Sequence, residues 1–419
     1  MKKITAILIL LTTTLLLAEN NPIANPSPAE RAIAQAQSAV AKKPNQCDGY
    51  NQLAMALARR ARETSAVNFY AQAEDALKKS LELSADNLDA QKIRVWLLLG
   101  RHEFAAALDE AKALNKRIPD DVLVYGFLVD ANAELGNYKD AATAAQWMLN
   151  LRPGNLPALT RAAYLRELFG DVDGALELMN MAYQSTPPTE NEDGSWILTQ
   201  MAHLRLSEGN TAEAETLLQQ ALQKFPDYHY ALGNLAKVRI MQHRSEDAIN
   251  LLQKRYDAAP HAENLYDLAE ALELAGRQGE AKKAFSEFEA KSLAESVRAD
   301  NSNRELIFYY ADHAHQQAKA LEIAQKEFTR RHDVYTLDAY AWALHVNGQN
   351  GEARKQIQAA LSVGIRDAKV LHHAGEIALS LGAHVAAEHF LQNAAALNAP
   401  GSEQARATLA SLTRSAQLR

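Results

Sequence analysis

Apolar residues recur at every third and fourth position along most of the chain, with polar residues between them. Leu165, Leu168 and Phe169 form one such set. This spacing places apolar side chains on one face of an α-helix, so it predicts a succession of amphipathic helices. Alanine, leucine, glutamine and glutamate dominate the composition, which favours helices packed on helices over β-sheets. The expected fold class is therefore all-α.

Glycines and prolines interrupt this pattern at a constant spacing. Gly136 and Gly170 are 34 residues apart, and so are Pro153 and Pro187. A glycine at the end of a helix tolerates the left-handed backbone of a sharp turn, and a proline ends a helix because it has no N–H. Each period therefore predicts a first helix, a tight turn, a second helix and a stop.

An alanine five residues after the turn repeats with the same period. The gaps between successive alanines are 34, 39, 34, 33, 39, 33 and 34 residues. A small side chain at this position lets the second helix pack closely against the first. A period this regular predicts one helical hairpin repeated along a solenoid. The alanines are Ala141, Ala175, Ala214, Ala248, Ala281, Ala320, Ala353 and Ala387.

These features resemble the tetratricopeptide repeat family over nearly the whole chain after its first residues. The resemblance implies a right-handed superhelix of helix-turn-helix hairpins, which is an α-solenoid. The chain departs from the family in its first helices, where alanine or valine mostly replaces the family's glycine and Gly375 is the exception. Arginine also stands where the family often has tyrosine, at Arg166, Arg205 and Arg239.

The periodic glycines, prolines and alanines give the expected boundaries of the repeats. We expect a half-repeat at 29–44, ten full repeats, and a polar capping helix at 400–419. Insertions lengthen the chain at 62–69, 188–194 and 292–303, and the first two can make a second contact at an edge. The ten repeats are expected at 47–87, 88–121, 122–155, 156–189, 195–228, 229–261, 262–291, 301–333, 334–367 and 368–399.

The first 18 residues have the layout of a secretory signal peptide. Two lysines precede an apolar run from Ile4 to Leu17, and Ala18 precedes polar residues. We expect cleavage after Ala18, a linker at 19–28, and a mature protein in the periplasm or outside the cell. A retained membrane anchor is the alternative, although the run is shorter than the roughly 20 residues that span a bilayer.

Three further stretches resemble a subgroup of exported bacterial tetratricopeptide proteins of unassigned role. They are "ARRARETSAVNFYAQAEDAL", "YLRELFGDVDGA" and "DAYAWAL", the last followed later by "HHAG". This resemblance implies a location in the bacterial envelope and no particular activity.

Charge and motifs argue against several classes of function. The formal net charge of −7 offers no electrostatic reason to bind nucleic acid or an anionic membrane. A single cysteine, Cys47, excludes an intramolecular disulfide and a cysteine-rich metal site. The sequence contains no phosphate-binding loop, nucleophile elbow, zinc-protease motif or dinucleotide fingerprint. We therefore expect neither an enzyme nor a bound cofactor.

The resemblance implies a binding groove. In tetratricopeptide proteins, positions 2, 5, 6, 9, 12 and 13 of each first helix line the concave side. Aromatic residues at such positions can anchor a peptide or a partner protein, because they bury a large area at a small cost in entropy. Alternatively, the rings pack between neighbouring helices. Expected groove residues are Trp96, Asp130, Tyr164, His203, Lys237, Glu270, Tyr309, Asp312, Asp338, Trp342, His373 and Glu376, with Trp196, Tyr230, Tyr266 and Tyr335 beside them.

The expected groove becomes acidic towards the C-terminus. Carboxylates and histidines gather in repeats 7 to 10, so a basic or neutral segment of a partner protein would suit this part of the groove. These carboxylates could equally form a solvated surface. The residues are Glu263, Glu270, Glu273, Glu305, Asp312, Asp338 and Glu376, with His313, His345, His372 and His373.

The histidines also raise an alternative function. His373 with Glu376 and His384 with Glu388 are pairs at helical spacing. Imidazole and carboxylate together can bind zinc, nickel or copper, which would suit a metal-handling accessory of the envelope. A metal site needs three or four convergent ligands, whereas the sequence contains only pairs. The preferred interpretation is a non-catalytic scaffold or adaptor that binds a protein partner in the concave groove, without a metal.

Overall fold

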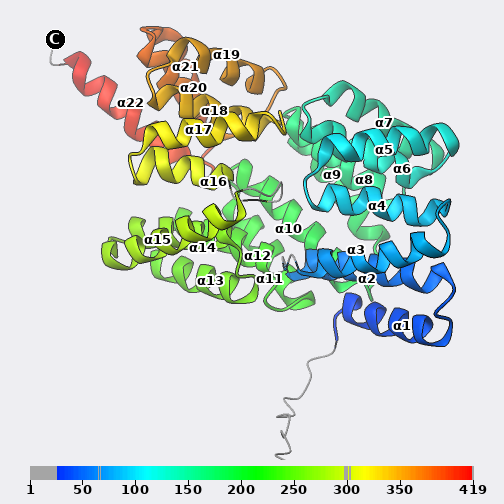
Figure 1. Ribbon diagram of the computed structural model, residues 1–419. Helices are drawn as coiled ribbons and strands as arrows, with labels where there is room; N and C mark the ends of the chain where they lie inside the picture. Colours follow the sequence, from blue (N-terminus) through cyan, green and yellow to red (C-terminus); the bar gives the residue numbers. More distant parts are fainter. Residues whose placement is uncertain (1–25, 65, 67, 297–300, 302, 418–419) are drawn as a thin grey trace, which may run out of the picture.

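The structure, a computed structural model, describes residues 26–64, 66, 68–296, 301 and 303–417. The expected signal peptide at 1–18 lies outside these residues. The described residues form 22 α-helices and one π-helical turn, with no β-strand (Figure 1). The predicted all-α solenoid of helical hairpins is therefore confirmed. None of the helices in the described part of the chain has the length and apolar content that crossing a membrane requires.

The helices alternate between first and second members of a hairpin. A single helix, α1 (Pro28–Lys42), precedes the hairpins, and α22 (Ser402–Gln417) follows them. The hairpins are α2 (Cys47–Thr64) with α3 (Asn68–Leu83), α4 (Leu88–Gly100) with α5 (Phe104–Arg117), α6 (Val122–Glu134) with α7 (Tyr138–Leu151), α8 (Leu156–Leu168) with α9 (Val172–Ser185), α10 (Asn191–Ser207) with α11 (Thr211–Lys224), α12 (His229–Met241) with α13 (Ser245–Ala258), α14 (Ala262–Leu274) with α15 (Gln278–Glu295), α16 (Asn303–Phe308) and η1 (Tyr309–His313) with α17 (Gln317–Phe328), α18 (Val334–Val346) with α19 (Asn350–Leu361), and α20 (Ala368–Ser380) with α21 (His384–Ala396).

Short polar side chains fix where many of the first helices begin. Each accepts a hydrogen bond from a backbone N–H of the first helical turn, which would otherwise have no partner. The capping residues are Asn87 for α4, Asp121 for α6, Asn155 for α8, Asp333 for α18 and Asp367 for α20.

The turns within the hairpins have the predicted left-handed backbone. Gly136 and Gly170 have φ values of 76° and 79°, which confirms their role in the turn. At the equivalent turn of three other hairpins a histidine adopts a positive φ, namely His102, His243 and His315. The turn conformation is therefore kept even where the chain has no glycine.

Three of the hairpin connections also contact a later hairpin, in the next turn of the superhelix. A Cβ atom on Gly170 would lie 2.5 Å from the carbonyl oxygen of Gly364, between α19 and α20. A Cβ on Gly136 would lie 2.7 Å from the carbonyl oxygen of His332, and one on Gly209 would lie 2.7 Å from that of Asn398. Glycine at these places therefore permits contact between hairpins that are far apart in the sequence.

The C-terminal hairpins pack on the N-terminal ones at this seam (Figure 1). One hydrophobic cluster joins buried residues of 95–168 with buried residues of 334–377. Beside it, Arg331 pairs with both Glu134 and Asp333, and the Val334 N–H donates to the Tyr138 hydroxyl over 2.9 Å. Apolar packing and half-buried ion pairs thus join the two ends of the superhelix.

The arginines that depart from the family pattern form ion pairs. Arg166 lies 2.7 Å from Asp171, and Arg205 lies 3.0 Å from Glu208. Arg239 of α12 reaches Glu215 of α11 over 2.7 Å. In each case a carboxylate in the same or the preceding hairpin accompanies the replacement of the family's tyrosine.

The Arg239–Glu215 pair predicts a pH dependence of stability. Hydrogen bonds from Arg239 and Gln242 lower the pKa of Glu215 from 4.5 to about 2. Because the folded-state pKa is the lower one, this pair stabilises the fold above pH 4.5 and stops doing so as the pH falls towards 2. Between pH 5 and pH 2.5 the wild type should lose about 1 kcal/mol more of its unfolding free energy than Glu215→Gln, after allowance for solvent screening. Urea unfolding at several pH values measures this, with the exposed Glu177→Gln as the control.

Candidate functional site: a cavity lined by the first five hairpins

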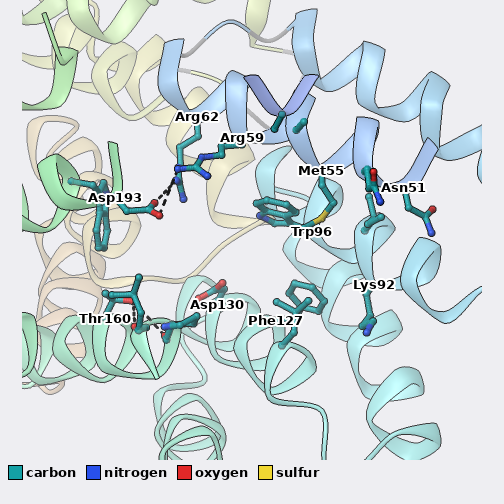
Figure 2. Close-up of a pocket in the computed structure, with 18 of the residues that line it drawn as sticks. Asn51, Met55, Arg59, Arg62, Lys92, Trp96, Phe127, Asp130, Thr160 and Asp193 are labelled. Carbon is teal, nitrogen blue, oxygen red and sulfur yellow. Dashed lines mark hydrogen bonds and ion pairs between the residues drawn. The ribbon is translucent and has the colours of Figure 1, made fainter. Parts of the chain in front are cut away.

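A cavity of about 1000 Å³ lies on the concave side of the N-terminal hairpins (Figure 2). Its walls come from α1 and from the first helices of five consecutive hairpins, α2, α4, α6, α8 and α10. The lining residues sit mainly at the same few positions of each helix, because successive hairpins repeat the same geometry. The volume is at the upper end of the roughly 300–1000 Å³ found for ligand sites in proteins.

Much of the cavity wall is apolar. Met55, Trp96 and Phe127 point into the same space from α2, α4 and α6 (Figure 2). Trp196 and Tyr164 line it from α10 and α8. Met55 is 37% exposed to the solvent of this cavity. An exposed methionine gathered in one hollow with half-buried aromatic side chains such as Trp96 and Trp196 is typical of a surface that contacts a partner.

The cationic side chains of the cavity are all paired with carboxylates. Arg161 donates two hydrogen bonds to Asp130, over 2.8 and 2.6 Å. Lys92 lies 2.9 Å from Asp89 and 3.1 Å from Asp121. Because the charges balance within the wall, an occupant does not need a charge of its own.

Ion pairs between α2 and α10 close the ring of first helices. Arg59 lies 2.6 Å from Glu190, which directly precedes α10. Arg62 lies 2.9 Å from Asp193 of α10 (Figure 2). Arg62 also pairs with Glu192, whose buried carboxylate accepts a hydrogen bond from Tyr228 over 2.9 Å. The insertions at 62–69 and 188–194, expected at an edge, thus contact each other.

Three of the expected groove residues meet in this cavity. Trp96, Asp130 and Tyr164 line it together with the neighbouring Trp196. His203, farther along α10, does not line the cavity, and its Nε2 lies 2.7 Å from Glu167. Burial disfavours the charged imidazole, but the Glu167 carboxylate outweighs that effect and raises the pKa of His203.

The other expected groove residues lie outside the cavity. Lys237 is exposed on α12. Glu270 accepts a hydrogen bond from Tyr266, and Tyr309 stacks on Phe285 with ring centroids 5.4 Å apart. Trp342 donates through Nε1 to Asp312 over 2.7 Å. Several of these aromatic side chains therefore pack against neighbouring helices, as in the alternative interpretation.

The structure differs from the expected acidic groove at Asp338 and His373. Both residues are only 3% exposed, and His373 Nδ1 lies 2.8 Å from the Asp338 carboxylate. His373 also stacks on Trp342, with centroids 4.2 Å apart. The pair therefore belongs to the packing between α18 and α20, and its groups do not face a ligand.

The remaining carboxylates of the acidic region also have partners. Glu270 and Glu273 both lie near His313, and Glu305 lies 3.3 Å from Arg304. Glu376 accepts a hydrogen bond from Thr408 over 2.7 Å and pairs with His372 rather than with His373. Within the described residues, no three histidine, cysteine, aspartate or glutamate side chains converge as metal ligands.

Sequence reasoning missed several residues of the cavity. Met55, Lys92, Phe127 and Arg161 occupy the lining positions of the repeat, so the register that places Trp96 could have placed them too. The contact between α2 and α10 has no such signal, because it joins residues about 130 positions apart outside the repeat pattern.

The comparisons with known proteins concern the fold. Residues 205–261 match the tetratricopeptide repeat family model, whereas no curated protein matches the sequence. Similar solved structures include human IFIT1 as a dimer with m7Gppp-AAAA, at 15% identity and TM-score 0.51, over 87% of this chain and 84% of that one. A monomeric IFIT1 mutant with Gppp-AAAA has 16% identity and TM-score 0.51, over 87% and 86% of the two chains.

The repeated hairpins and the family match together define the class. The chain has the fold of a tetratricopeptide-type α-solenoid, and residues 205–261 match the family model itself. That fold is typical of protein-interaction scaffolds, which are generally not catalytic.

Proposed function

We propose that this protein is a non-catalytic scaffold that holds a segment of a partner protein in the cavity of its first five hairpins. The observation that carries the proposal is the cavity itself, in which Met55, Trp96 and Trp196 are gathered from three different hairpins. Aromatic anchors in a concave site supply most of the energy in peptide recognition.

The chemistry of the wall favours an uncharged, largely apolar segment. Arg161 is matched by Asp130, and Lys92 by Asp89 and Asp121, so a charged partner would have to break an existing pair. Of the two alternatives drawn from the sequence, a basic or a neutral partner, the cavity supports the neutral one. Phosphate chains such as those of the RNA analogues held by IFIT1 would need free cations, and here the cavity's cations are engaged.

We also propose that the protein works in the cell envelope. The support is the signal-like layout of residues 1–18, with a charged start, an apolar run and a small residue at Ala18. A mature protein that begins at Glu19 in the envelope fraction is the expected result, and recovery of the whole chain from the cytoplasm would contradict it.

A peptide selection tests the function. A random 12-residue library displayed on phage would be panned on residues 19–419, and selected peptides measured by fluorescence anisotropy. We expect uncharged peptides rich in aromatic and aliphatic residues. Their affinity should fall about thirtyfold for Trp96→Leu, since an anchoring aromatic contributes about 2 kcal/mol. Met55→Lys, which places a charge in the cavity without disturbing the core, should weaken binding similarly.

Trp147→Ala is the matched control, because Trp147 is an exposed tryptophan on α7, outside the cavity. It should bind the peptides like the wild type. Selected peptides that bind all variants equally would contradict the proposed site. Tight, Trp96-dependent binding of m7Gppp-AAAA would replace the peptide with a nucleic acid as the ligand.

A further inference from the structure

Two methionines of the described chain have exposed side chains. Met55 is 37% exposed and Met181 is 43% exposed. Met148 and Met179, by contrast, are only 0% and 3% exposed. A dissolved oxidant must touch the thioether sulfur to react with it, so oxidation follows exposure. Met55 and Met181 are therefore the methionines that such a reagent reaches first.

Of these two residues, only Met55 belongs to the cavity. It is the ninth residue of α2, as Trp96 is the ninth residue of α4, so both side chains reach the wall from the same position of successive hairpins (Figure 2). Met181 lies on α9, the second helix of its hairpin, and is not a lining residue. The same oxidation therefore has different consequences at the two positions.

Met55 contributes to the wall of the cavity and not to the hydrophobic core. None of the hydrophobic clusters formed by the described residues includes its side chain. Its neighbours Ala54 and Ala56 are 0% and 5% exposed, so other residues hold α2 against its partners. A chemical change at Met55 thus alters the cavity and leaves the packing of α2 in place.

Oxidation adds one polar atom to a methionine side chain. The sulfur lone pair attacks an oxygen of a hydroperoxide, the O–O bond breaks, and the oxygen stays on the sulfur as a sulfoxide. The sulfur loses two electrons, and the hydroperoxide is reduced to an alcohol, or to water in the case of hydrogen peroxide. A reductase can reverse the step with two thiols, which become a disulfide while the oxygen leaves as water.

The cations of the cavity wall are already engaged and do not compensate a new polar group. Arg161 pairs with Asp130, and Lys92 pairs with Asp89 and Asp121. An apolar segment that covers a sulfoxide must therefore displace its water without replacing the hydrogen bonds, which weakens binding. Oxidised Met55 disfavours the uncharged ligand that the reduced wall suits.

We propose that Met55 is an oxidation site through which hydroperoxides weaken binding in the cavity. This proposal rests on the proposed function, since it assigns the regulation of the same site. Oxidation of Met55 can be measured without any ligand, so that failure of the oxidation site and failure of the peptide site are separate results.

Mapping of the sulfoxides tests whether Met55 is accessible. The protein carries Cys47→Ser, which removes its single thiol, and is treated with hydrogen peroxide for increasing times. Mass spectrometry of proteolytic peptides measures the oxidised fraction of each methionine. Met55 should be oxidised within about threefold of the rate of Met181, and about tenfold faster than the buried Met148. Oxidation of Met55 as slow as that of Met148 would overturn the proposal.

Affinities before and after peroxide treatment test the consequence for binding. The affinity of the selected peptides should fall about tenfold on oxidation, and methionine sulfoxide reductases for both epimers, supplied with a dithiol, should restore it. Met55→Leu has an affinity of its own, which peroxide should leave unchanged. Met181→Leu is the matched control and should lose as much affinity on oxidation as the protein that keeps Met181.

Two binding results would overturn the proposal. One is equal affinity before and after complete oxidation of Met55, and the other is the same loss in Met55→Leu, which would place the effect on another residue. If no peptide binds the untreated protein, the proposed function fails, and the neutral apolar dye Nile red decides instead. Its fluorescence with the protein should fall on oxidation when Met55 is present and stay constant in Met55→Leu. Equal changes in the two proteins would contradict a role for Met55.

Discussion

Gly170→Ala is expected to lower the free energy of unfolding by about 3 kcal/mol. The backbone at Gly170 has a φ of 79°, which costs a residue with a side chain about 1–2 kcal/mol. The new methyl group would also lie 2.5 Å from the carbonyl oxygen of Gly364, so the seam between the two halves of the superhelix must move apart. Urea unfolding followed by circular dichroism measures the loss.

Gly276→Ala separates the cost of the left-handed backbone from the cost of the clash at the seam. Gly276 has nearly the same φ, 76°, but nothing lies within 4 Å of a Cβ atom placed there. Gly276→Ala should lower the free energy of unfolding only by the cost of the positive φ, about 1 kcal/mol. Equal losses for the two variants would mean that Gly170 is needed for its turn alone and not for the seam. Hydrogen exchange should show added opening of α8 and α20 only in Gly170→Ala.

Arg331→Met should cost about 3 kcal/mol of unfolding free energy as well. Arg331 neutralises Glu134 and Asp333 where the two halves of the chain meet, and methionine keeps its apolar stem while removing the charge. Burial raises the pKa of Glu134 to about 7 even with Arg331 present, and the variant leaves this carboxylate without its main partner. The loss should be larger at pH 8 than at pH 5, because a protonated Glu134 needs no counter-charge.

Arg277→Met is the control for this prediction. Arg277 also bridges two carboxylates, Glu246 and Glu280, but both carboxylates are exposed and Arg277 itself is only half-buried. Its removal should change the stability too little to resolve, since exposed ion pairs contribute little. Similar losses for the two arginines would contradict the assignment of Arg331 as a half-buried link between the superhelical turns.

The fold could be predicted because its signals are local and repeated. Gly136, Pro153 and their counterparts mark the ends of helices, and each helix end depends on a few neighbouring residues. The seam could not be predicted in this way. The contact of Gly170 with Gly364 joins residues 194 positions apart, and no repeat rule says which hairpins meet after a turn of the superhelix.

The sequence predicted the lining of the expected groove correctly only in the N-terminal repeats. The position rule places Trp96, Asp130 and Tyr164 on a shared concave face, and the structure brings them to one cavity. The same rule places Asp338 and His373 on that face, yet they pair with each other and are buried. A position in a repeat fixes the direction of a side chain but not the charge and size of its neighbours in the next hairpin.

The central claim is that a partner segment occupies the cavity of the first five hairpins, and photo-crosslinking tests it most directly. A benzophenone amino acid would replace Met55 in the cavity or Gln146 on the outer face of α7, in the organism that makes the protein. We expect that an uncharged, apolar peptide of one partner protein crosslinks at position 55, is absent at position 146, and is lost with Trp96→Leu. Crosslinks that form equally at both positions, or only to a nucleic acid, would contradict it.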